Sequence, residues 1–342
     1  MTGYRALELI EPAVKKTKDL LLKDFQIRFW LRMGLVVFLM TSLDSGLNVS
    51  RSLSSEELDA RFSGLAFPLI ILFVVTIICV ALIFGIVSSI ASFVFLESVM
   101  SGRVSIREGF KKHFRRGLSL FAFRLLIGIA VVVVVVLLAI PVILLSSHGL
   151  GTGFLILLAY LVPAFGVFIA VITVAALVDS FTTDFVIVFM LEKGDGIIAS
   201  WKRLTAVIRA ERMQFLVYVI VKLVLKIVAG ILSLIVSLII LLAAAIILGV
   251  PLLVIGMLLY KFSGFNIMAL KAAGLIILPV ILLGVIIALA IIWLLAYAII
   301  VVTLPLPVFF RYYSLMFIEK SARQKNEGKP KTEQKGRDYY VD

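Results

Sequence analysis

Long apolar runs alternate with short polar stretches along the whole chain, which is the pattern of a protein with several transmembrane helices. A helix needs about 20 apolar residues to cross the hydrocarbon core of a bilayer. We predict six spans, over 26–44, 65–96, 119–145, 153–178, 214–248 and 273–304. The first is the weakest, because Arg28 and Arg32 leave few uncharged residues before Asp44.

The stretch 214–260 is almost continuously apolar and too long for one span. A single helix of that length would measure roughly 70 Å, against a hydrocarbon thickness of about 30 Å. Proline interrupts a helix, so Pro251 predicts a break after Gly249. We predict one long, tilted span followed by a short helix over 251–260 at the outer interface. A tight hairpin of two spans is the alternative, and it would put the last eight basic residues outside.

Several polar stretches keep a helical repeat of apolar residues, which predicts amphipathic helices in the cytoplasmic interface. They precede spans 1, 3 and 5, and a fourth follows span 6 near 307–317. Those over 106–118 and 197–208 share an aromatic residue followed by a basic pair. These residues are Phe110, Lys111 and Lys112 in one helix, and Trp201, Lys202 and Arg203 in the other.

Local signals predict the starts and the apolar faces of these helices. Ser105 and Glu108 have the spacing of a capping box, and Asp195 is expected to cap the helix that starts at 197. The expected membrane-facing stripes are Leu7, Ile10, Val14, Leu21 and Phe25 in the first helix, and Ile106, Phe110, Phe114 and Leu118 in the second.

Composition excludes a soluble globular protein. Hydrophobic residues make up 63% of the 342 residues, against roughly 45–50% in soluble domains. We therefore predict an all-α integral membrane protein with six transmembrane helices in a single polytopic domain over 1–320. The charged stretch 321–342 cannot bury enough apolar surface to fold, so we expect a disordered cytoplasmic tail.

The distribution of basic residues predicts the orientation. From the N-terminus to the C-terminus, the polar segments carry seven, two, six, no, five, two and eight Lys and Arg, where the first count covers residues 1–32 and includes Arg28 and Arg32 at the start of span 1. High counts mark the cytoplasmic side, so both termini are expected in the cytoplasm of a cell membrane. This topology also explains the net charge of +13 without a nucleic-acid partner.

Residue sets for catalysis or metal binding are missing from the sequence. The two histidines, His113 and His148, are predicted on opposite faces of the membrane, and a zinc site needs several such ligands together. No phosphate-binding loop of the type G-x-x-x-x-G-K-[ST] occurs. We therefore expect no metal, no cofactor and no enzymatic activity.

Charged residues within or beside the spans are the best candidates for a functional site, because charge is costly in hydrocarbon. They are Arg124, Lys222, Lys226, Glu97, Asp179 and Asp184. One hypothesis is a polar cavity, open to the cytoplasm, whose cations face an anion or a lipid headgroup. The alternative is that the cations extend to the interface or pair with the carboxylates for structural reasons.

Four stretches together resemble a known family: 6–39, 102–126, 182–204 and 306–317. They read "ALELIEPAVKKTKDLLLKDFQIRFWLRMGLVVFL", "GRVSIREGFKKHFRRGLSLFAFRLL", "TTDFVIVFMLEKGDGIIASWKRL" and "LPVFFRYYSLMF". The resemblance is to uncharacterised archaeal multi-pass proteins, which are similar to the membrane domain of some glycerophosphoryl diester phosphodiesterases. It implies a six-span helical fold and no established activity.

The sequence favours two functions, and a membrane-embedded enzyme that uses the carboxylates of Asp179 and Asp184 is a third, less favoured hypothesis. The first is a non-enzymatic membrane protein that organises anionic lipids or membrane-protein partners at the cytoplasmic face through its basic interfacial helices. The second is a carrier or lipid-handling protein that uses the cationic cavity, and Lys226 is the residue whose replacement would test it.

Overall fold

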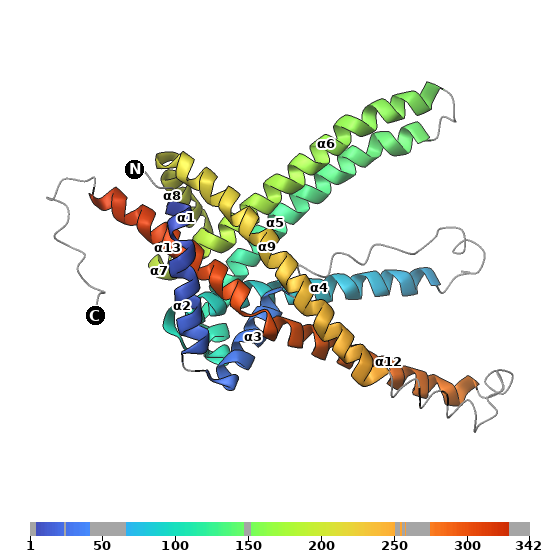
Figure 1. The fold of residues 1–342 in the computed structure, drawn as a ribbon. Helices are drawn as coiled ribbons and strands as arrows, with labels where there is room; N and C mark the ends of the chain where they lie inside the picture. Colours follow the sequence, from blue (N-terminus) through green and yellow to red (C-terminus); the bar gives the residue numbers. More distant parts are fainter. Residues whose placement is uncertain are drawn as a thin grey trace. The chain divides into compact units, whose positions relative to one another are not determined.

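The protein is described from a computed structural model, which covers residues 5–23, 25–41, 66–146, 152–249 and 274–327 together with residues 254 and 257. These parts are helical and contain no strand (Figure 1). Five of the described helical segments are long and apolar enough to cross a membrane: Ile71–Ser101, Ile106–Leu144, Leu158–Lys193, Arg212–Gly249 and Leu282–Val302. An all-helical protein with several membrane-spanning helices is therefore confirmed.

The first predicted span, 26–44, is not confirmed. Helix α3 occupies this region as Ile27–Thr41 and has 15 residues. At about 1.5 Å per residue it is roughly 22 Å long, less than the hydrocarbon thickness of about 30 Å. Residues 42–44 lie outside the described part of the chain.

The chain divides into two compact units, and each is considered by itself. The first unit comprises Met1–Phe38 and Leu216–Phe310, and the second comprises Leu39–Phe215 and Arg311–Asp342. The prediction of a single domain over 1–320 stays a prediction.

The first unit contains the N-terminal helices and most of the two long helices nearest the C-terminus that are predicted to span the membrane. They are α1 (Arg5–Glu8), α2 (Ile10–Leu22), α3, α9 (Arg212–Ala244) with the π-helix η3 (Ala245–Gly249), and α12 (Gly274–Val302). Helices α3 and α12 pack closely, because a Cβ on Gly34 would lie 2.6 Å from Val301 Cγ2. The Tyr297 hydroxyl of α12 also donates to the Leu31 carbonyl at 2.8 Å.

The predicted N-terminal stripe is only partly correct. Leu7 and Val14 are exposed, as a membrane-facing stripe requires, but Leu21 is buried. The buried face of α1 and α2 consists instead of Ala6, Leu9, Ala13, Thr17 and Leu21. Both faces carry apolar residues, so periodicity alone could not tell which of them packs against protein.

In the second unit, three long helices pack in succession, α4 against α5 and α5 against α6, and four further helical elements follow. Its elements are α4 (Ala66–Ser101), α5 (Ile106–Ser146), α6 (Thr152–Phe181), the π-helix η2 (Thr182–Val186), α7 (Ile187–Lys193), α8 (Ile197–Ala210) and most of α13 (Pro305–Glu327). Gly102 ends α4 with a φ of 66°, a conformation that glycine adopts without strain. The rings of Phe185, Phe215 and Phe317 contact one another in the core, with centroids 5.2–6.1 Å apart.

Three predicted element boundaries need correction or lie beyond view. The separate interfacial helix over 106–118 is wrong, because it continues into the third span as one helix of 41 residues. The expected tail over 321–342 begins with helix, since α13 extends to Glu327. The predicted helix over 251–260 lies outside the described residues, apart from residues 254 and 257. The last described residue of the preceding helical segment is Gly249, so the predicted break after it also lies outside the described residues.

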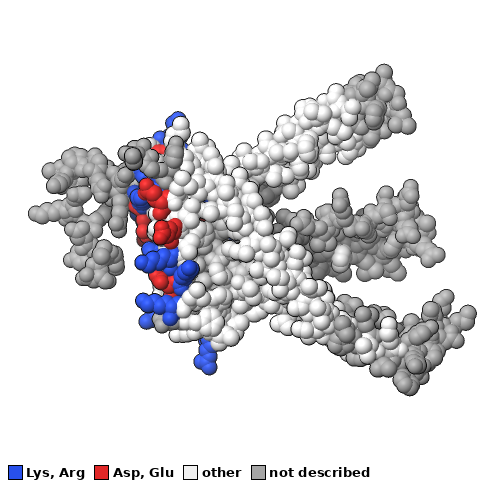
Figure 2. Space-filling model, viewed as in Figure 1, with Lys and Arg blue, Asp and Glu red and all other residues white. Residues whose placement is uncertain are grey.

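Burial changes along the helices of the second unit. In α4, residues 71–82 are exposed, whereas residues 88–96 are buried. Helix α5 carries no charged residue after Arg124, and the part of α5 after Arg124 and of α6 before Asp179 contains no Lys, Arg, Asp or Glu (Figure 2). The packed core therefore lies in the helix segments that also carry the charges, and the apolar remainder is left for lipid.

Candidate functional site

An ion pair joins α5 to α6 where the apolar surface begins. Arg124 Nε donates to Asp179 Oδ1 at 2.9 Å, and Arg124 Nη2 donates to the Thr183 hydroxyl at 2.9 Å. Both ionic side chains remain partly exposed, at 26% for Arg124 and 48% for Asp179. This is the kind of pairing that the structural alternative predicts for these two charges.

A buried arginine reaches the same place from α13. Arg311 is 4% exposed, and its Nη1 donates to the Thr183 carbonyl through a short hydrogen bond. Its Nη2 donates to the Ser92 carbonyl of α4 at 3.3 Å, and its guanidinium lies over the Phe95 ring. We call Arg124, Asp179, Thr183 and Arg311 the Thr183 cluster.

The local backbone around Thr183 is unusual. Residues Thr182–Val186 form a π-helix, in which hydrogen bonds run from i to i+5 and the regular ladder is interrupted. Such bulges often occur at functional sites. Within this π-helix, the hydroxyl of Thr183 accepts a hydrogen bond from α5 and its carbonyl accepts one from α13.

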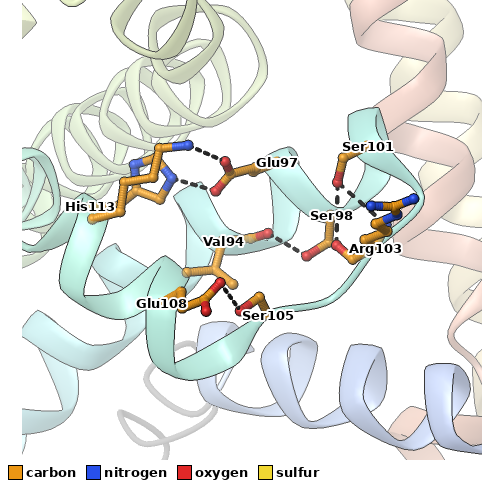
Figure 3. A network of polar contacts seen from close by, with 9 residues as sticks. Val94, Glu97, Ser98, Ser101, Arg103, Ser105, Glu108 and His113 are labelled. Atoms are coloured by element: carbon orange, nitrogen blue, oxygen red, sulfur yellow. Dashed lines mark hydrogen bonds and ion pairs between the residues drawn. The ribbon is translucent and has the colours of Figure 1, made fainter.

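A second polar group lies at the cytoplasm-directed turn predicted between α4 and α5. Glu97 on α4 accepts a short hydrogen bond from Lys112 and lies 2.7 Å from His113 Nε2, both on α5 (Figure 3). The His113 ring is 0% exposed and stacks on Phe93 at a centroid distance of 5.9 Å. This group shares no side chain with the Thr183 cluster. Glu97 therefore does not bond Arg124, which it was predicted to join in one cavity.

The other charges of the predicted cavity are placed as follows. Asp184 is buried in η2, and its Oδ2 accepts from the Ser180 hydroxyl at 3.4 Å. Lys222 and Lys226 belong to the first unit, apart from the unit that holds Arg124. Lys222 is 7% exposed, with its Nζ 5.8 Å from the centre of the Tyr218 ring, whereas Lys226 is exposed.

The first part of α5 has two different faces. Gly109, His113, Gly117 and Leu120 are buried. The opposite side carries Lys111, Phe114, Arg115 and Leu118, which are all exposed and which we call the α5 basic face. Phe114 and Leu118 were predicted on the membrane-facing stripe, and their exposures are 55% and 42%. Phe110 is half-buried between the two faces.

The α8 region begins differently from the prediction. Its N-cap is Gly196, with no side-chain cap, so Asp195 does not cap this helix. Asp195 instead forms an ion pair with Arg203 at 2.8 Å. Lys202 is exposed, and Trp201 is half-buried with its ring 6.1 Å from that of Phe123 on α5.

Ser105 and Glu108 lie at the start of α5, as the capping-box prediction requires, but their hydrogen bonds differ from those of a capping box. Ser105 directly precedes α5, and its hydroxyl donates to Glu108 Oε2 at 2.9 Å (Figure 3). The two side chains therefore bond each other, whereas a capping box bonds each side chain to a backbone N–H. The first helical bond, from Gly109 N to Ser105 O, is present at 3.0 Å.

Sequence reasoning missed Arg311 and Thr183, and it used His113 only in the search for metal sites. A single arginine between "LPVFF" and "YYSLMF" was the available signal for Arg311, because an apolar setting makes its charge costly. Within the described residues, no group of three or more His, Cys, Asp or Glu side chains is placed to hold a metal ion.

These features define the class of protein. Several long apolar helices, with polar clusters where the charged segments begin, make this a multi-pass helical membrane protein. The chain matches a family of unknown function, DUF7544, over residues 4–324, and it belongs to that family.

The other comparisons add no relative. No curated protein and no solved structure matches the chain. A family without an assigned function agrees with the prediction from sequence. The similarity to the membrane domain of glycerophosphoryl diester phosphodiesterases and the archaeal source gain no support and stay predictions.

Proposed function

We propose that this chain is a non-enzymatic membrane protein that organises anionic lipids at the cytoplasmic face of the cell membrane. The observation that carries the proposal is the α5 basic face. Lys111 and Arg115 are exposed there beside Phe114 and Leu118, and neither basic side chain bonds another side chain in the described part of the protein.

This face matches the chemistry of an anionic membrane surface. Basic side chains near such a surface are attracted to the lipid headgroups, and exposed aromatic and aliphatic side chains enter the boundary between headgroups and chains. The opposite face of the same segment is buried, so the basic face is the side of this segment that is left free to meet headgroups. Because α5 continues without interruption into the apolar segment, a single helix carries both this face and the residues that would span the membrane.

Topology is part of the proposal. The alternation of basic residues in the sequence supports a cytoplasmic location for both termini. With α3 as a short first span, six spans remain our proposal. The α8 segment and the N-terminal helices, with their exposed lysines and apolar side chains, would lie in the same cytoplasmic interface.

The experiment is native mass spectrometry of the protein purified in mild detergent. We expect bound anionic phospholipid in the wild type and roughly tenfold weaker binding in the Lys111→Gln/Arg115→Gln variant. The control variant Arg103→Gln/Lys193→Gln removes the same charge from exposed residues outside this face. Equal loss in both variants, or a protein partner in place of lipid, would contradict the proposal.

The carrier function is the second candidate, and Lys222 is the observation that favours it. This lysine is 7% exposed although it lies in an apolar helix, which is costly unless it serves a purpose. A small anion retained in the same measurement and lost in Lys222→Leu would favour the carrier.

A further inference from the structure

Arg124 retains hydrogen-bonding capacity that the described protein does not use. A guanidinium has five N–H groups. One at Nε serves Asp179 and one at Nη2 serves Thr183, and among the described residues no further side chain accepts from Arg124. Three N–H groups are thus left on a side chain that is 26% exposed.

The position of Arg124 along α5 places those N–H groups at a boundary. The 22 residues from Leu125 to Ser146 carry no charge and would span about 33 Å as a helix. This length covers the hydrocarbon core of about 30 Å by itself. In α6, all residues from Thr152 to Val178 are likewise uncharged, and Asp179 follows them directly. Arg124 and Asp179 therefore mark the level where hydrocarbon meets headgroups, rather than a point inside the hydrocarbon.

A strip of α5 that follows Arg124 toward the C-terminus is exposed and apolar. Gly128 lies one turn further along the same face, and a Cβ added there would meet nothing within 4 Å. Val132 and Val135 continue this strip, with exposures of 60% and 37%. A cationic group followed by an open apolar strip matches a phosphate attached to a hydrocarbon chain.

We propose that Arg124 binds the phosphate of a membrane phospholipid, whose chain lies along Gly128, Val132 and Val135. Asp179 and Thr183 hold the guanidinium in place and leave its remaining N–H groups for the phosphate oxygens. The proposal rests on the proposed function only for the placement of the chain in a bilayer. Its site is on a different side of α5 from Lys111 and Arg115.

The test is a titration of the delipidated protein in detergent with phosphatidylglycerol, followed by native mass spectrometry. Diacylglycerol with the same chains tests the need for the headgroup, and inorganic phosphate is the competitor. We expect wild type to bind phosphatidylglycerol at least about tenfold more tightly than diacylglycerol, and Arg124→Gln to lose this difference. Asp179→Asn should bind as tightly or more tightly, because the amide oxygen can still accept from Arg124 Nε while the negative charge beside the phosphate is removed. Unchanged binding by Arg124→Gln, or displacement by inorganic phosphate, would overturn the proposal.

A second variant keeps the test decisive if Arg124→Gln does not fold. Gly128→Phe fills the open strip and leaves Arg124 bonded to Asp179 and Thr183. We expect weaker phosphatidylglycerol binding at an unchanged melting temperature, and unchanged binding would count against the site. Loss of binding in Lys111→Gln/Arg115→Gln with none in Arg124→Gln or Gly128→Phe would overturn this inference and leave the proposed function standing. The reverse result would overturn the proposed function alone.

Discussion

At the scale of single residues, the least expected feature is that Thr183 bonds arginines from two other helices. Its hydroxyl accepts from Arg124 on α5, and its carbonyl accepts from Arg311 on α13. Neither partner can be inferred from sequence spacing, because Arg124 and Arg311 lie 59 and 128 residues away from Thr183. The sequence did predict that Arg124 and Asp179 are important, since each interrupts or ends an apolar run.

Replacing Arg311 tests whether this cluster stabilises the second unit. Arg311→Met retains an unbranched side chain but removes the guanidinium that donates to the carbonyls of Thr183 and Ser92. We expect the free energy of unfolding to fall by about 2–4 kcal/mol, because hydrogen bonds from a buried charge are lost. Denaturation of the purified protein by added sodium dodecyl sulfate measures this change.

The matched control is Arg107→Met, since Arg107 is exposed near the start of α5. Its free energy of unfolding should stay within about 0.5 kcal/mol of wild type. If both variants were destabilised alike, the effect would come from the loss of any arginine and the role assigned to Arg311 would be wrong.

At the scale of helices, close packing between α4 and α5 fixes which side of α5 faces the lipid. A Cβ on Gly117 would lie 2.4 Å from Ile90 Cγ1 and 2.9 Å from Ile90 Cα, and a Cβ on Gly109 would lie 3.0 Å from Val94 Cγ2. These two glycines let the helices approach closely, as small residues do in membrane proteins. The α5 basic face is consequently directed away from α4.

Gly117→Ala should therefore destabilise the hairpin of α4 and α5. The added methyl group meets the Cα atom of Ile90, which belongs to the main chain and cannot move aside as a side chain can. We expect the free energy of unfolding to fall by about 1–3 kcal/mol. The same denaturation measurement applies.

Gly128→Ala is the control on the same helix, because its Cβ would meet nothing within 4 Å. Alanine has the higher helix propensity, so stability should be unchanged or higher by up to about 1 kcal/mol. A Gly117→Ala protein as stable as this control would show that the helices do not pack as described.

The long helices were predictable because an apolar run of sufficient length has few alternatives in a bilayer. The continuity of α5 was not predicted, although no proline lies between Ile106 and Pro141 and nothing else forces a break near residue 118. In the first unit, Leu21 was assigned to the lipid-facing stripe but is buried. Helical periodicity identifies faces, and only tertiary packing decides which face meets protein.

At the scale of the whole molecule, lipid is the natural partner of most of the surface. In the second unit the exposed apolar segments of α4, α5 and α6 follow directly on the charged, packed ones. The polar groups around Glu97 and Thr183 lie on the packed side of that transition. We therefore propose that the apolar segments lie in the hydrocarbon and the basic side chains among the headgroups.

The most direct test of this account is the composition of the lipid that surrounds the protein in a bilayer. Quenching of the three tryptophans, Trp30, Trp201 and Trp293, by brominated lipids reports which lipids are in contact with the protein. In bilayers of equal parts phosphatidylglycerol and phosphatidylcholine, we expect stronger quenching when the anionic lipid carries the bromine. The difference should shrink as salt is raised, because salt screens exposed charges. Equal quenching by both lipids at low salt would contradict the claim that this protein organises anionic lipids.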